Sequence, residues 1–69
     1  MLWTIDAIKA AMPTVQVRVG KHIYTGYLAG RHKRFPTVYY GPLSATMAHT
    51  TWSWAAIQRC LNTDTPLLP

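Results

Sequence analysis

A strict alternation of apolar and polar residues early in the chain predicts a β-strand over residues 14–19. The segment reads Thr-Val-Gln-Val-Arg-Val, so its three valines point to one side of a sheet. Gly20 and Lys21 follow, and a glycine at the first central position suits a two-residue type II′ hairpin turn. We therefore expect a return strand over residues 22–29.

The two-residue turn also predicts how these strands pair. Val17 should lie opposite Tyr24 on the valine side, which is the expected core face of the sheet. Arg18 and Tyr27 should lie on the other face, because successive side chains of a strand point to opposite sides. That second face is expected to be open to solvent or to a ligand.

Helical spacing of apolar residues predicts a short helix before the strands, within residues 1–13. Ile5, Ile8 and Met12 recur at i, i+3 and i+7 and form one apolar stripe. Thr4 stands where an N-cap residue is expected. A helix this short is unstable in isolation, so its stripe must pack on the rest of the fold.

A second helix is predicted near the end of the chain. Trp54, Ile57 and Leu61 recur at i, i+3 and i+7 and give it a buried face. Ser53 is placed to cap its first turn, and Asn62 is expected to end it.

Further strand signals lie between the hairpin and this last helix. Residues 37–40 are predicted to form a third strand, and residues 50–52 a brief fourth one. The segment 43–49 fits either a helical turn or a loop. We thus expect a β-rich core with its closing helix over 14–62, followed by an extended tail over 63–69.

The fold class expected is a small β-rich α+β domain, with one short helix at each end of the chain. A length of 69 residues allows one domain, residues 1–69. Two architectures fit the order of elements. One is an antiparallel sheet of three to four strands with its C-terminal helix laid across one face, and the other is an SH3-like barrel.

Charge suggests the type of partner. The chain has seven Lys and Arg but only two Asp and no Glu, a formal net charge of +5. Three of the seven cations fall in the segment Arg31-His32-Lys33-Arg34, between the second and third predicted strands. Weakly neutralised cations beside aromatic strands favour contact with a polyanion, and we expect DNA or RNA.

The sequence therefore predicts a small basic nucleic-acid-binding protein, for example an accessory or regulatory factor of a mobile element. Candidate binding residues combine the basic segment with exposed positions of the hairpin: Arg18, Lys21, Tyr27, Arg31, His32, Lys33 and Arg34. Phe35, Tyr39 and Tyr40 are additional candidates for stacking on bases, if they are exposed.

Other chemistry has little support in the sequence. Asp6 and Asp64 are remote from each other and are explained by a helix start and a turn, so no acid–base pair is expected. Cys60 is predicted to be a buried structural thiol rather than a nucleophile. The three His lack the spacing of a zinc site. We expect no enzyme activity, metal or cofactor.

The apolar content raises a second possibility. Hydrophobic residues make up 49% of the chain, which favours burial against another subunit, and we expect a homo-oligomer. A non-enzymatic protein-interaction module, such as an SH3-like adaptor or inhibitor, remains the alternative to nucleic-acid binding. No apolar stretch reaches the roughly 20 residues that span a bilayer. With no signal-peptide pattern, a cytoplasmic protein without membrane contact is expected.

The run from Thr51 to Arg59, Thr-Trp-Ser-Trp-Ala-Ala-Ile-Gln-Arg, resembles the closing strand and short helix of type II plasmid-borne dihydrofolate reductases. Those enzymes are SH3-like tetramers with one central pore, so the resemblance implies a barrel. In that family a Gln-Ile-Tyr stretch lines the pore, whereas this chain has Thr50, Thr51 and Trp52. No reductase activity is therefore implied. The order of elements is also similar to that of AP2-type and integrase arm-type DNA-binding domains.

Overall fold

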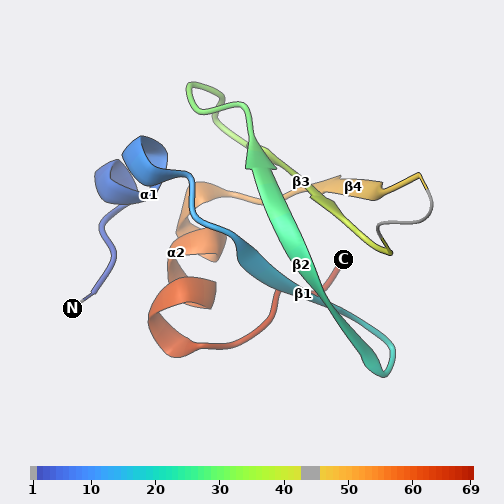
Figure 1. Ribbon diagram of the computed structural model, residues 1–69. Helices are drawn as coiled ribbons and strands as arrows, with labels where there is room; N and C mark the ends of the chain where they lie inside the picture. The colour runs from blue at the N-terminus through green and yellow to red at the C-terminus, as the bar shows by residue number, and fades with distance from the viewer. Residues whose placement is uncertain (1, 43–45) are drawn as a thin grey trace.

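The computed structural model describes residues 2–42 and 46–69. Four strands form one antiparallel sheet in the order β1-β2-β3-β4, and both helices lie toward one side of it (Figure 1). The elements, in chain order, are α1 (Ile5–Ala11), β1 (Val15–Val19), β2 (His22–Ala29), β3 (Thr37–Tyr40), β4 (Ala48–Thr51) and α2 (Trp54–Thr63). The α+β class predicted from the sequence is confirmed.

The first hairpin forms with the predicted register. Val17 pairs with Tyr24, and Val19 pairs with His22 across the turn. Gly20 has a φ of 61°, whereas Lys21 is not among the residues with positive φ. Positive φ at the first central position alone is the pattern of a type II′ turn, the type expected from the glycine.

One face of the sheet forms the core. Residues that pair across an antiparallel sheet point to the same side. One row of paired residues is Val15, Gly26 and Tyr40, and another contains Leu28 and Val38. Both rows lie on the same face as Val17. α2 packs against this face, and α1 packs beside α2 with Ile8 in the same buried cluster. The core consists of the buried residues of both helices, the strands and the tail: Ile8, Val15, Val17, Val38, Tyr40, Trp54, Ile57, Cys60 and Leu67.

Both helices begin at the predicted caps. The Thr4 hydroxyl accepts a hydrogen bond from the Ala7 amide at 3.1 Å, and the Ser53 hydroxyl accepts one from the Ala56 amide at 3.1 Å. The predicted end of the second helix, with Asn62 as its stop, was wrong by two residues. α2 runs to Thr63, and its left-handed cap is Asp64 with a φ of 53° rather than Asn62.

Asn62 has a different structural role, which explains this correction. Its side-chain oxygen accepts a hydrogen bond from the Trp3 amide at 2.7 Å, and its amide nitrogen donates to the Trp3 carbonyl at 3.0 Å. Gln58 donates to the same carbonyl at 3.1 Å. These bonds attach the segment before α1 to α2, so Asn62 serves a long-range contact instead of a helix end.

The sheet does not close, so the SH3-like barrel is not the architecture adopted. Closure would require β1 to pair with β4, but the free edge of β1 is occupied by the tail. The Leu67 amide donates to the Gln16 carbonyl at 2.8 Å, and the Leu67 carbonyl accepts from the Arg18 amide at 2.9 Å, in a parallel bridge. Leu68 accepts a hydrogen bond from the Trp52 indole at 3.2 Å. The tail thus stands between β1 and the residue that follows β4.

The fourth strand lies two residues earlier than its predicted start. β4 covers Ala48–Thr51 and pairs with β3, so that Tyr39 faces His49 and Tyr40 faces Ala48. Trp52, expected inside this strand, follows it and packs against the core beside Tyr40. The open question of a helical turn or loop over 43–49 falls partly on residues 43–45, outside the described part of the chain.

Gly26 permits the close approach of the strands beneath α2. A β-carbon at this position would lie 2.7 Å from Val38 Cγ1 and 3.0 Å from Val15 Cγ2. The first contact is closer than β-carbons approach other atoms and the second is very tight, so the branched valine side chains would have to shift. We therefore expect Gly26→Ala to lower the free energy of unfolding by about 1–3 kcal/mol, as overpacking of a core typically does.

Denaturant unfolding followed by circular dichroism measures this loss. Thr25→Ala is the matched control, because Thr25 is adjacent but exposed on the opposite face. It should cost less than about 1 kcal/mol, within the span of strand propensities. Equal stability of Gly26→Ala and wild type would contradict the packing described for this face.

Candidate nucleic-acid interface

Among the described residues, neither helix lies on the face of the sheet opposite the core. We call it the outer face, and it consists of ten residues in register across the four strands: Gln16, Arg18, Ile23, Thr25, Tyr27, Ala29, Thr37, Tyr39, His49 and Thr51. Most of these side chains are exposed, and none is acidic. Arg18 and Tyr27 lie on this face, as the predicted register required.

A row of rings crosses the middle of the outer face. Tyr27 on β2 pairs with Tyr39 on β3, which in turn pairs with His49 on β4. The Tyr39 and His49 rings lie 5.6 Å apart between centroids, with a tilt of 40°. Tyr27 and Tyr39 are 43% and 42% exposed, so their rings remain available to a ligand.

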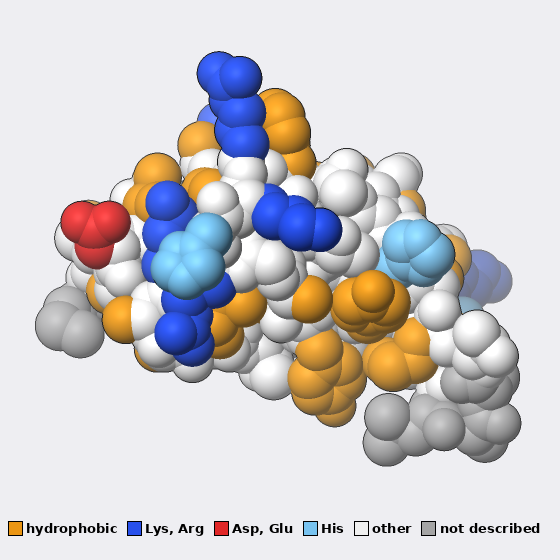
Figure 2. Space-filling view, turned by 90° about the horizontal axis from the view of Figure 1, so that it is seen from above, with side chains coloured by type: hydrophobic (Ala, Val, Ile, Leu, Met, Phe, Trp, Pro, Cys, Tyr) orange, Lys and Arg blue, Asp and Glu red, His pale blue; other side chains and the backbone are white. Residues whose placement is uncertain are grey.

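The basic segment lies at the end of the outer face, where β2 turns into β3. We call residues 30–34 the basic loop. Arg31, His32, Lys33 and Arg34 are all exposed. Figure 2, a view from above this loop, shows a group of Lys, Arg and His side chains with hydrophobic side chains exposed beside it. The cations predicted from composition are thus displayed on the surface.

The core residue Trp54 holds the basic loop in place. Its indole N–H donates to the Lys33 carbonyl at 2.6 Å, and the Lys33 amide donates to the Gly30 carbonyl at 2.9 Å. The Trp54 side chain is buried in the first turn of α2, whose N-cap Ser53 sets its direction. The loop backbone is therefore tied to the core while its side chains point to solvent.

Lys9 is a cation near this loop that the sequence analysis did not include. Its ammonium lies 5.4 Å from the centroid of the Trp54 ring, the same ring whose N–H binds Lys33. A cation over an indole face is a favourable contact. The contact between Lys9 and Trp54 could not be predicted from the position of Lys9 in its helix, because it depends on how α1 packs against α2.

The remaining predicted site residues do not all join this surface. Lys21 lies in the β1–β2 turn, at the other end of the hairpin from the basic loop. Arg18 is near that end of the outer face. Tyr40 is only 7% exposed and points into the core, so it is unavailable for stacking, whereas Phe35 beside the loop is 53% exposed.

His49 was also missed by the sequence analysis. Its place in the ring row follows from the pairing of β4 with β3, and the predicted strand began one residue after it. The outward direction of Tyr39 could have been predicted from the alternation of side chains along β3. Val38 faces the core, so the next residue must face outward.

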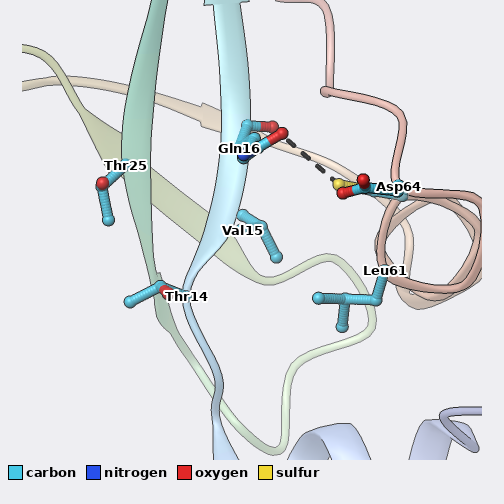
Figure 3. A pocket seen from close by; sticks show the side chains of 7 residues that line it. Thr14, Val15, Gln16, Thr25, Leu61 and Asp64 are labelled. Atoms are coloured by element: carbon cyan, nitrogen blue, oxygen red, sulfur yellow. Dashed lines mark hydrogen bonds between the residues drawn. The ribbon is translucent and has the colours of Figure 1, made fainter. Parts of the chain in front are cut away.

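Neither carboxylate belongs to the outer face, although Asp64 lies near its β1 edge and shares a hollow with Gln16 and Thr25. Asp6 is in the first turn of α1, and Asp64 caps the end of α2. Asp64 borders a hollow of about 280 Å³ between β1 and α2, where the thiol of Cys60 approaches the Gln16 carbonyl at 3.9 Å (Figure 3). Cys60 is buried, as predicted. No cation lines this hollow among the described residues, so it does not suit a phosphate.

The hydrogen bond from Trp54 to the basic loop yields a prediction. Trp54→Phe keeps a buried ring but removes the donor to the Lys33 carbonyl. We expect a loss of about 1–2 kcal/mol of stability and faster hydrogen exchange at the Lys33 amide, measured by NMR. In the control Trp52→Phe, the lost bond goes to Leu68, so exchange at Lys33 should stay unchanged. Unaltered Lys33 exchange in Trp54→Phe would mean that the indole does not hold the loop.

Comparison with known proteins adds no assignment to this geometry. No family model, curated protein or solved structure matches the chain. Within residues 2–42 and 46–69, neither helix is long and apolar enough to cross a membrane, and no three His, Cys, Asp or Glu side chains gather as metal ligands would. The candidate site therefore rests on the charge, exposure and arrangement of this chain's own residues.

Proposed function

We propose that this protein binds nucleic acid through its outer face and its basic loop. The proposal rests on one observation, namely that the basic loop and the aromatic outer face lie next to each other. The basic loop is fastened to the core through Trp54, and it borders an uncovered sheet face that has aromatic rings and no carboxylate. A surface that combines cations with exposed rings matches the phosphates and bases of a nucleic acid.

Electrostatics supports this choice of partner. The whole chain has a formal net charge of +5, and Arg31, Lys33 and Arg34 contribute three of the seven Lys and Arg from one loop. Each phosphate neutralised by such a cation releases condensed counterions, which favours binding at low salt. Because Lys9 approaches the loop through Trp54, it adds a further positive charge at this end of the molecule.

The alternative function is a non-enzymatic protein-interaction module, and exposed apolar residues favour it. Ile23 is 56% exposed on the outer face, and Phe35 is 53% exposed beside the basic loop. Such residues suit a protein partner or a second copy of the chain. A second copy seated on the outer face would compete with nucleic acid for the same surface, so the two readings are separable by experiment.

Removal of loop cations tests the main proposal. We expect Arg31→Gln combined with Arg34→Gln to weaken binding to labelled DNA or RNA in an anisotropy titration. The slope of log K against log salt should become shallower by about 1.4–1.8, which corresponds to two lost phosphate contacts. Lys33 is left unchanged so that the residue whose carbonyl and amide make the loop's hydrogen bonds keeps its native conformational preferences.

The matched control is Lys21→Gln combined with Arg59→Gln. It removes the same net charge from the β1–β2 turn, at the other end of the hairpin from the basic loop, and from α2, which packs on the core face. This control should retain most of the affinity and the wild-type salt slope. Equal losses in both double variants would show that net charge alone, and not the basic loop, attracts the polyanion.

The oligomeric alternative has its own measurement. If the outer face is covered by a second copy, light scattering should give twice the mass of one chain, and Ile23→Lys should reduce it to a single chain by placing a charge in the interface. Salt-sensitive nucleic-acid binding, together with a mass that Ile23→Lys does not change, is the result that the main proposal requires.

A further inference from the structure

We infer that the ligand is single-stranded nucleic acid, with unpaired bases stacked on the ring row Tyr27–Tyr39–His49. This inference rests on the proposed function and specifies which form of nucleic acid the surface accepts. The three rings come from adjacent strands β2, β3 and β4, paired in direct register. They therefore form one line across the sheet rather than a scattered set.

The spacing of this row suits successive bases. Neighbouring strands lie about 4.8 Å apart, so the row extends for about 10 Å across the outer face. Tyr39 is supported on one side by the His49 ring at 5.6 Å, which limits its rotation. Tyr27 and Tyr39 keep more than two fifths of their surface exposed, because neither helix of the described residues covers this side of the sheet.

Exposed ring faces select unpaired bases. In a duplex both faces of each base are covered by its neighbours, and the groove presents base edges to the protein instead. A single strand can splay its bases onto aromatic side chains, and every base offers a face for this contact. A four-stranded sheet is also broader than the two-stranded ribbon that a major groove admits.

Cations flank the ring row on both sides, so a strand that runs along the row has basic side chains beside its phosphates whichever side its backbone takes. Arg18 lies toward the β1–β2 turn, two rows of paired residues from Tyr27 along the sheet. The basic loop begins one row beyond Tyr27 in the other direction, after the Ala29–Thr37 pair. The arrangement is complementary to a chain of alternating bases and negative charges, and no carboxylate interrupts it.

The test uses four fluorescein-labelled probes in anisotropy titrations: an oligothymidylate, a mixed-sequence RNA strand, an abasic DNA strand and a DNA duplex, all of one length. The base-bearing single strands should bind at least tenfold more tightly than the abasic strand, which has the same phosphates without bases. They should also bind more tightly than the duplex at equal salt.

Substitutions at the rings provide the second part of the test. Tyr27→Val and Tyr39→Val each remove a ring but keep a strand-forming residue, and each should weaken binding of the oligothymidylate by roughly 5- to 100-fold. Tyr27→Phe and Tyr39→Phe keep the ring and should bind like wild type. None of the four should change binding of the abasic strand, and thermal unfolding confirms that each variant is folded.

The outcomes separate this inference from the proposed function. Equal affinity for abasic and base-bearing strands, tighter binding of the duplex, or no effect of the valine substitutions would each overturn the stacking inference. In those cases a basic nucleic-acid-binding surface would still stand. If no probe binds at low salt, both proposals fail, and a protein partner or a second copy becomes the occupant of the outer face.

Discussion

One-sided burial is the constraint on which this structure depends. The helices of this short chain lie on one side of the sheet, where Val17 and Val38 share a single buried cluster with Ile57 of α2 and Ile8 of α1. Small chains bury a modest fraction of their surface, so a second covering layer is beyond their reach. The strand period of two then dictates the rest, since every alternate residue must point to the uncovered side. The ring row and Arg18 are exposed for this reason.

Features governed by neighbouring residues could be predicted from the sequence. A two-residue turn at Gly20 sets the register of the first hairpin, because it leaves one way to pair the flanking strands. Ser53 and Thr4 cap their helices through hydrogen bonds three residues away. The basic loop was recognisable from composition alone, since three cations in four residues must be solvated or paired.

Features governed by distant residues could not be predicted. Asn62 resembled a helix end, but its amide binds the backbone of Trp3, 59 positions earlier. The indole of Trp54 binds the basic loop across 21 positions, and neither residue suggests the other. The sequence of β4 has little apolar alternation, and the strand forms because it pairs with β3. The predicted start of this strand was therefore wrong, and the position of His49 on the outer face was not predicted. The open sheet was one of two architectures that local patterns left possible, and the contact of Leu67 with β1 decides between them.

The bridge between Leu67 and β1 also makes the two margins of the sheet unequal. It occupies the Gln16 carbonyl and the Arg18 amide, which otherwise offer a template for an incoming strand. Within the described residues, nothing pairs with the outer margin of β4. Growth into a fibre by strand addition needs two receptive margins on each molecule, one for each neighbour. A molecule with only one unpaired sheet edge can add one other molecule by strand pairing. Self-assembly through this edge therefore stops at a dimer.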